Sequence, residues 1–113
     1  MAVESVPQIT VHDLSHWLEE RRDVVVVDVR EPSEWAEGHI PGAVALPMNE
    51  AAVRGHELPP DRPKAVLCAG GLRSSTVISA LKRRGGGDWF NVTGGMTAWA
   101  RAGGALERPP APR

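Results

Sequence analysis

Four consecutive valines at residues 24–27 form the feature that most restricts the folds open to this sequence. The run is β-branched and does not alternate between apolar and polar residues, which is typical of a strand buried on both faces. Such strands occur in parallel sheets that helices cover on both sides. Because strand-like and helix-like segments alternate along the chain, the sequence predicts an α/β fold with its functional site at the carboxyl ends of the strands.

The rest of the chain fits one domain, because 113 residues can form a hydrophobic core without disulfides or a metal. We expect residues 1–113 to form this single unit, with a core of about residues 8–106 and a disordered, proline-containing tail at residues 107–113. Further strands are expected at residues 8–9, 43–46, 64–67 and 89–92, and helices at residues 11–22, 33–37, 49–54, 74–84 and 96–102. Thr10 is the expected N-cap of the first helix.

Charge and cysteine content exclude several classes of protein. The net charge of −1, with both signs interspersed, provides no basic surface for nucleic acid or for an anionic membrane. The single cysteine rules out an internal disulfide framework and a cysteine-rich zinc site. Because we find neither a signal peptide nor a membrane-spanning stretch, the cytoplasm is the simplest expected compartment.

Two histidines in the first predicted helix, His12 and His16, superficially resemble a metalloprotease motif. Asp13 stands where that motif needs glutamate, and no third ligand is evident. Both histidines lie opposite the apolar face of the helix. We therefore expect a solvated helix face here and no metal site.

The candidate reactive group is Cys68, which follows the predicted strand at residues 64–67 and begins a glycine-containing loop before a helix near Arg73. At the amino end of a helix, unpaired backbone N–H groups and the helix dipole favour negative charge. This placement lowers the pKa of a thiol and favours the nucleophilic thiolate. The same N–H groups, together with Arg73, are suited to bind an anionic substrate. A buried structural cysteine is the simpler alternative, but the strand–loop–helix context favours the reactive one.

Three blocks of the sequence resemble the motifs of single-domain rhodanese-like proteins, the thiosulfate sulfurtransferase family. They are residues 28–43 (DVREPSEWAEGHIPGA), residues 68–73 (CAGGLR) and residues 94–99 (GGMTAW). The blocks occur in the order and spacing of the family and extend the resemblance over about residues 8–106. The resemblance implies a three-layer α/β/α fold with a five-stranded parallel sheet.

The resemblance also implies a chemistry and a set of site residues. Cys68 would attack the outer sulfur of a donor such as thiosulfate or a persulfide, become a persulfide itself, and pass that sulfur to cyanide, a thiol or a sulfur-accepting protein. This two-step covalent transfer needs no metal or organic cofactor. The substrate-binding residues carried over from the family are the loop that follows the cysteine: Ala69, Gly70, Gly71, Leu72 and Arg73.

The sequence departs from the usual family pattern beside the cysteine. Ala69 occupies a position that is often basic in single-domain members, and Leu72 occupies one that is often polar. Because a missing positive charge weakens binding of dianionic thiosulfate, the donor of this protein could be another compound. Asp28, Arg30, Glu34 and His39 are interpreted as a structural network beneath the loop rather than as catalytic acids and bases.

Two other functions stay open at the level of the sequence. Phosphatases of the cell-cycle type and arsenate reductases also use a cysteine loop that ends in arginine, but the phosphatase loop contains one residue more than the four that separate Cys68 from Arg73 here. A binding or regulatory module with little turnover is the second alternative, since a fold does not define a function. The intact Cys68 and Arg73 argue against it, and Ala69 argues mildly for it.

Overall fold

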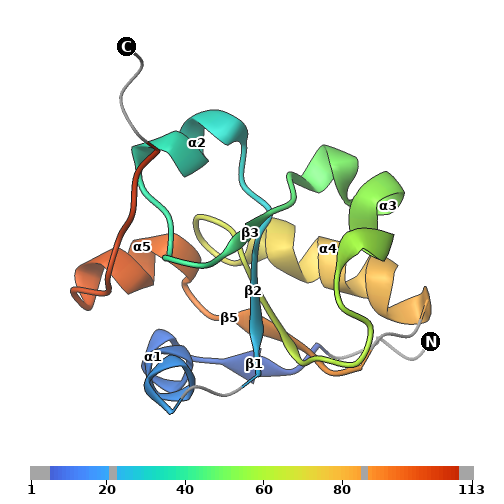
Figure 1. Cartoon of the computed structure of the whole chain (residues 1–113), viewed down its shortest axis with the longest axis horizontal. Coiled ribbons are helices and arrows are strands. Elements are labelled where there is room, and N and C mark those ends of the chain that lie inside the picture. The colour runs from blue at the N-terminus through green and yellow to red at the C-terminus, as the bar shows by residue number, and fades with distance from the viewer. Residues whose placement is uncertain (1–5, 21–22, 85–86, 110–113) are drawn as a thin grey trace.

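A parallel sheet forms the middle layer of the fold (Figure 1). The computed structural model describes residues 6–20, 23–84 and 87–109. Within these residues, the sheet has five strands in the order β1-β5-β4-β2-β3, and every neighbouring pair is parallel. The strands are β1 (Gln8–Ile9), β2 (Val25–Asp28), β3 (Val44–Ala45), β4 (Lys64–Leu67) and β5 (Trp89–Val92). The predicted α/β architecture and its five-stranded parallel sheet are confirmed.

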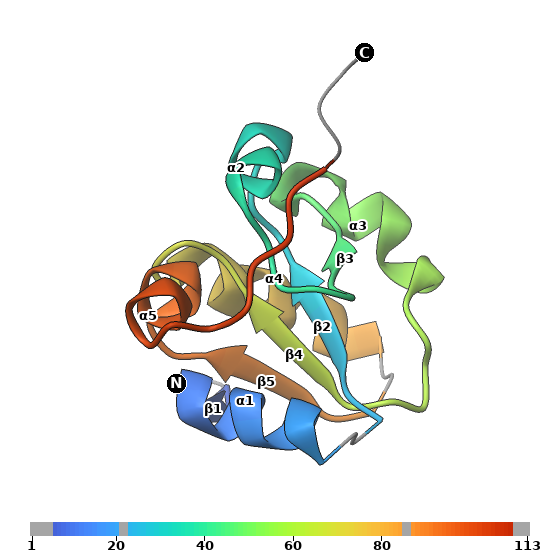
Figure 2. The ribbon, with the colours of Figure 1, turned by 60° about the vertical axis from the view of Figure 1, so that its left-hand side comes forward.

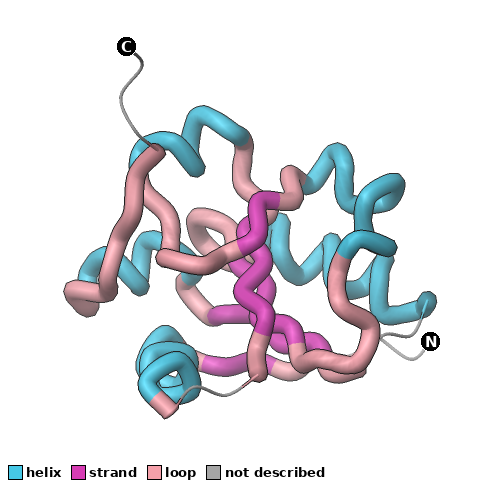
Figure 3. The backbone as a smooth tube through the Cα atoms, viewed as in Figure 1, coloured by secondary structure: helices cyan, strands magenta, loops and turns pink. Residues whose placement is uncertain are grey.

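Helices cover both faces of this sheet (Figure 2). On one face lie α1 (Val11–Glu19) and α5 (Gly95–Arg101), and on the other lie α3 (Ala51–Arg54) and α4 (Leu72–Leu81). The short α2 (Pro32–Glu37) follows β2 at the carboxyl edge of the sheet (Figures 1 and 3). Among the described residues, none of the helices is long and apolar enough to cross a lipid bilayer.

The valine run behaves as the sequence predicts. All four residues of β2 and all four of β4 are buried, so both central strands are covered on both faces. Val27 and Val66 pack with α3 and α4, whereas Val26 and Leu67 pack with α1 and α5. Because successive side chains of a strand point to opposite faces, this arrangement places Cys68 on the same face as Val66, beneath α4.

The first helix begins where the sequence predicts and ends earlier. The Thr10 side chain accepts a hydrogen bond from the Asp13 N–H, and the Asp13 carboxylate accepts one from the Thr10 N–H, each at 3.0 Å. This reciprocal capping box fixes the start of α1. The helix was expected to reach residue 22, but it ends at Glu19, with Glu20 as its C-cap and the N–H of Glu20 bonded to the carbonyls of His16 and Leu18. Residues 21–22 lie outside the described residues.

The segment after α5 differs from the expected disordered tail. Glu107 and His39 exchange two backbone hydrogen bonds, of 2.9 and 2.8 Å, and Arg108 Nε donates to the Glu37 carbonyl at 2.8 Å. The chain thus crosses from α5 back to α2 (Figure 2). The start of the predicted tail is paired because the His39 backbone offers both a donor and an acceptor to it. Residues 110–113 lie outside the described residues.

Candidate active site

Cys68 lies at the carboxyl end of β4, in a tight loop that leads into α4. Its side chain is almost completely buried, with 1% of its surface exposed. The Gly71 N–H donates a 3.0 Å hydrogen bond to Sγ, and the Ser74 hydroxyl lies 3.5 Å from the same sulfur. Gly71 adopts a φ of 108°, a left-handed conformation that favours glycine, and it is the N-cap of α4. The loop therefore wraps its backbone around the sulfur.

The surroundings of Cys68 favour its ionised form. Burial raises the pKa of the thiol, and this is the largest single influence on it. Hydrogen bonds from the backbone N–H groups of Ser74, Gly71 and Gly70 act in the opposite direction, and the Ser74 hydroxyl adds to them when its proton points to the sulfur. These hydrogen bonds together outweigh burial, so the pKa of Cys68 lies below its ordinary value. The predicted thiolate-favouring placement at the helix amino end agrees with this geometry.

The beginning of α5 supports the loop from the other side. The Met96 N–H donates to the Cys68 carbonyl at 2.8 Å, and the Thr97 N–H donates to the Ala69 carbonyl at 3.1 Å. This close approach requires glycine at position 95, where φ is 51° and a Cβ atom would collide with the Cys68 carbonyl oxygen. The helix start thus fixes two peptide groups of the loop.

Arg73 joins the loop to α2. Its Nη1 and Nη2 atoms donate to the two carboxylate oxygens of Glu34, at 2.7 and 3.0 Å. Hydrogen bonding to Arg73 is the main reason that the pKa of Glu34 falls from 4.5 to about 2. The sequence assigned Arg73 to an anion site, whereas in this structure much of its charge is balanced by Glu34. The pair acts as a tie that holds the loop against α2.

The pKa of Glu34 predicts a pH-dependent stability. Because folding lowers this pKa, the pair stabilises the folded protein above about pH 4.5, and its contribution is lost as the pH falls toward 2. Glu34→Gln should therefore be less stable than the wild type at neutral pH, and the difference should shrink across this acidic range. Urea unfolding at a series of pH values measures it. Glu37→Gln, an exposed glutamate of the same helix, is the matched control. If the difference in unfolding free energy between the wild type and Glu34→Gln stayed constant with pH, the Glu34–Arg73 pair would not be the source of this stability.

A second ion pair fixes the end of β2 beside the loop. Arg30 donates from Nε and Nη2 to the carboxylate of Asp28, with the shortest contact at 2.8 Å, and both side chains are buried. The same guanidinium reaches the Gly38 carbonyl at 2.8 Å and the Glu34 carbonyl at 3.3 Å. Arg30 therefore connects the end of β2 to the middle of α2 and to the residue that caps its carboxyl end. These contacts support the interpretation of a structural network.

The structure adds two residues that the sequence did not single out. Ser74, in the first turn of α4, contacts the Cys68 sulfur, and it makes a short hydrogen bond to Asn91 of β5. Both side chains are buried. One signal was present in the sequence: Asn91 is polar within an otherwise apolar strand, and a buried polar group needs a partner.

Within the loop at residues 68–73, Arg73 is the only basic residue, and Glu34 pairs with it. Ala69 is half-buried, Gly70 is exposed, and 85% of the Leu72 side-chain surface is exposed. An incoming anion therefore meets backbone N–H groups and an apolar rim.

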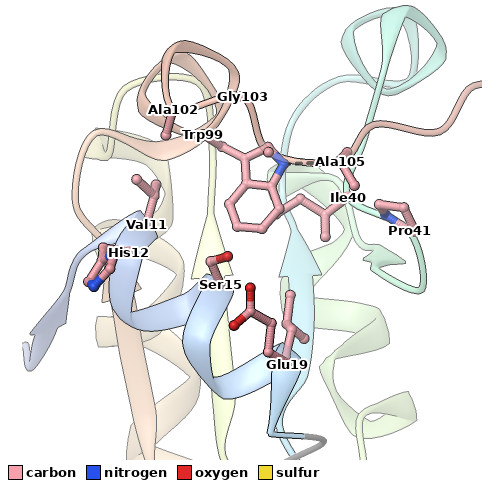
Figure 4. Close-up of a pocket in the computed structure, with 12 residues that line it drawn as sticks. Val11, His12, Ser15, Glu19, Ile40, Pro41, Trp99, Ala102, Gly103 and Ala105 are labelled. Atoms are coloured by element: carbon pink, nitrogen blue, oxygen red, sulfur yellow. Dashed lines mark hydrogen bonds between the residues drawn. The ribbon is translucent and has the colours of Figure 1, made fainter.

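A pocket of about 680 Å³ lies on the opposite side of the sheet from α4, between α1, residues 40–41 and the segment from Trp99 to Ala105. Ser15 and Glu19 of α1 face Ile40 and Trp99 across it (Figure 4). No residue of the loop 68–73 lines this pocket, so the pocket is separate from Cys68.

The two histidines of α1 are exposed, as expected for a solvated helix face. His16 Nε2 lies 2.8 Å from the carboxylate of Glu20, one turn along the helix. Within the part of the chain that the structure describes, no three histidine, cysteine or acidic side chains are grouped so that they could hold a metal ion.

Comparisons with known proteins agree with this geometry. Residues 10–102 match the Rhodanese-like domain family. The chain is 39% identical over 104 residues to a protein named sulfurtransferase from Allochromatium vinosum, covering 92% of this chain and 97% of that protein. It is 36% identical over 83 residues to the thiosulfate sulfurtransferase GlpE of Pseudoalteromonas translucida, covering 74% and 79%. The crystal structure of a rhodanese-like domain protein from Staphylococcus aureus superposes with a TM-score of 0.83 at 36% identity, covering 93% and 100%. Several other curated relatives are longer, and the chain spans 24% to 51% of their length.

Proposed function

This chain belongs to the rhodanese-like domain family, and we propose that it is a sulfurtransferase in which Cys68 carries the transferred sulfur atom. The observation that carries the proposal is the surroundings of the Cys68 sulfur. It is a cysteine with a lowered pKa, held by the Gly71 N–H at the amino end of the ten-residue helix α4. A thiolate in such a site is both nucleophilic and able to carry a negatively charged product.

The proposed reaction has two steps. In the first, the Cys68 thiolate attacks the outer sulfur of the donor, an S–S bond forms on Cys68, and the S–S bond of the donor breaks. The leaving group, sulfite from thiosulfate or a thiolate from a persulfide, departs with the electron pair of that bond. In the second step, the acceptor attacks the terminal sulfur of the persulfide, and the Cys68 thiolate is released. The sulfane sulfur is transferred from the donor to the acceptor, and no external oxidant or reductant is consumed.

The loop backbone is suited to stabilise the persulfide. The terminal sulfur of a persulfide is negatively charged near neutral pH, and the backbone N–H groups of Gly70, Gly71 and Ser74 interact with the Cys68 sulfur at the start of α4. These groups support the proposal that the loop from Ala69 to Arg73 binds the substrate. Two peptide groups of this loop are held by α5, so their orientation is fixed before a donor arrives. A preorganised group of donors stabilises charge without having to reorient during the reaction.

The same site bears on the choice of donor. Thiosulfate is a dianion, and the relative GlpE is named for it. Here Ala69 provides no charge and the charge of Arg73 is balanced by Glu34. A persulfide donor carries less negative charge, and the exposed Leu72 offers an apolar contact to an organic or protein carrier. We therefore propose a persulfide as the preferred donor, and a thiol or a sulfur-accepting protein as the acceptor, with cyanide as an artificial one.

Intact-mass measurement tests the proposal directly. After incubation with thiosulfate or with a low-molecular-weight persulfide, the wild type should gain the mass of one sulfur atom, and dithiothreitol or cyanide should remove it. The persulfide should load faster than thiosulfate, and Ala69→Arg should narrow this gap by attracting the dianion. If no donor produced an adduct, the enzymatic proposal would be refuted and a binding or regulatory module would be favoured.

The length of the loop favours sulfur transfer over phosphate chemistry. Four residues separate Cys68 from Arg73, and the Gly71 N–H already bonds to the sulfur itself. A cradle for a phosphate needs a wider ring of N–H groups, and the guanidinium that would face the phosphate is held by Glu34. If the wild type released phosphate from an aryl phosphate and Cys68→Ala did not, phosphatase activity would be favoured over sulfur transfer.

A further inference from the structure

A chain of polar side chains runs from the Cys68 sulfur to the edge of the sheet. Sγ lies 3.5 Å from the Ser74 hydroxyl, and Ser74 makes a short hydrogen bond to Asn91 Oδ1. On the other side, Asn91 Nδ2 donates to Gln8 Oε1 at 2.7 Å. Cys68, Ser74 and Asn91 are buried, whereas Gln8 is exposed. The reactive sulfur is thus connected to the surface by side-chain hydrogen bonds.

The register of the sheet brings these side chains together. Asn91 is the Cα partner of Gln8 on β1 and of Val66 on β4, so the three residues form one row across neighbouring strands. Cys68 lies two residues beyond Val66 and therefore on the same face. Ser74 covers this row from α4. The connection is consequently a product of strand pairing and helix position, both of which are fixed by the core.

The direction of the chain depends on a single proton. A serine hydroxyl has one proton to donate, and three acceptors lie near that of Ser74: Asn91 Oδ1, the Gly71 carbonyl at 3.2 Å and the Cys68 sulfur. When Asn91 presents its oxygen, Ser74 donates to it and offers the sulfur only a lone pair. When Asn91 presents its NH₂ group, Ser74 is free to donate to the sulfur.

Gln8 determines which end Asn91 presents. In the structure, Gln8 Nε2 donates to the Val6 carbonyl at 3.2 Å, and Gln8 Oε1 accepts from both Asn91 Nδ2 and Thr93 Oγ1. The oxygen of Gln8 therefore faces Asn91, the oxygen of Asn91 faces Ser74, and the Ser74 proton points away from Cys68. A hydrogen-bond donor at position 8 would turn the Asn91 amide around and reverse the direction of the hydrogen bond between Asn91 and Ser74.

We propose that Gln8 and Asn91 are positioning residues that set the direction of the Ser74 proton and, through it, the number of hydrogen bonds that the Cys68 sulfur receives. The inference deepens the proposed function and rests on it, because Cys68 must be the nucleophile for the effect to reach sulfur transfer. Reversal of the chain adds the Ser74 hydroxyl to the Gly71 N–H as a donor. One more donor favours the thiolate and the anionic persulfide.

Two variants at the exposed position 8 test the direction of the chain. Gln8→Lys offers only donors and should reverse the chain, whereas Gln8→Glu offers only acceptors and should preserve it. The measurement is the pH midpoint of Cys68 alkylation by iodoacetamide. We expect the midpoint of Gln8→Lys to fall by about one pH unit, the size expected for one hydrogen bond to a charged group, and that of Gln8→Glu to stay near the wild type.

The charge introduced at position 8 needs its own control, because a lysine favours a thiolate through space and a glutamate opposes it. The same two variants are therefore also measured in the Ser74→Ala background, which interrupts the hydrogen-bond chain and keeps the charges. The control background is Ser75→Ala, because the Ser75 hydroxyl donates to the Gly71 carbonyl and is not part of the chain. The other charged groups beside the loop, the Arg73–Glu34 pair of α4 and α2 and the Asp28–Arg30 pair of β2, are unchanged throughout.

The outcomes separate the inference from the proposed function. The proposal is supported if the alkylation midpoints of Gln8→Lys and Gln8→Glu differ in the Ser75→Ala background and no longer differ in the Ser74→Ala background. Equal differences in both backgrounds, or no difference with Ser74 present, would overturn it. Alkylation measures the thiol alone. If the Gln8 effect appeared in a protein that formed no persulfide with any donor, the sulfurtransferase proposal would fail while the positioning role of Gln8 and Asn91 stood.

Discussion

Replacement of Cys68 by serine is expected to reduce sulfur transfer by a factor on the order of a thousand or more, as removal of a covalent nucleophile generally does. A serine hydroxyl is far less acidic than this thiol, and it forms no persulfide. The chain contains no second cysteine that could take over. Initial rates of thiocyanate formation from cyanide, with thiosulfate or a persulfide as the donor, measure the loss, and intact mass should show no added sulfur.

The folded state of this variant should be close to that of the wild type. Serine is slightly smaller than cysteine, and the Gly71 N–H and the Ser74 hydroxyl can still bond to its oxygen. An unchanged melting temperature beside the lost rate would assign the loss to chemistry. Transfer at a rate comparable with the wild type would show that another group carries the sulfur, and the proposed function would be wrong.

The second large effect is expected at Asp28, where Asp28→Ala should lower both the stability and the activity of the protein. The carboxylate is 1% exposed and binds the buried Arg30 guanidinium. Removal of one partner leaves an uncompensated buried charge, which costs about 3–5 kcal/mol. In a domain of this size, such a loss lowers the melting temperature by on the order of 15 °C or more. Thermal unfolding, with sulfur-transfer rates measured well below the transition, tests it.

A matched variant distinguishes the structural role from a catalytic one. Asp28→Asn keeps an oxygen that can accept from Arg30 and loses only the charge, so its stability should lie between those of the wild type and Asp28→Ala. Activity should follow stability in this series, because Asp28 acts by holding the end of β2. An unchanged melting curve with lost activity in Asp28→Ala would reverse the assignment and make Asp28 part of the chemistry.

The parts of this fold that the sequence predicts well are those that depend on local patterns. The valines of β2 predict a doubly covered strand because a parallel sheet leaves no face for polar residues, and the structure confirms it. Thr10 predicts the start of α1 because an N-cap acts on the turn that follows it, and the structure confirms this start and adds a capping box with Asp13. The position of Cys68 between a strand and a helix was likewise readable, and its role as the nucleophile stays a prediction.

The contacts that the sequence left undetermined join residues far apart in the chain. Arg73 was expected to serve an anion, but which carboxylate would reach it depends on how α2 lies against α4. Ser74 and Asn91 meet only because β5 pairs with β4. Glu107 looked like the start of a disordered tail because the composition of a segment does not show that a distant backbone, that of His39, has free groups for it.

The path of the chain after α5 has a consequence for the engineering of this domain. The backbone pairing of Glu107 with His39 and the contact of Arg108 with Glu37 deliver the chain beside α2, whose Glu34 binds the active loop (Figure 1). A sulfur-accepting protein joined directly after Pro109 would begin its linker at the edge of the sheet that carries Cys68. A short linker would then give the acceptor a high effective concentration at Cys68, and transfer would no longer depend on how often two separate proteins collide.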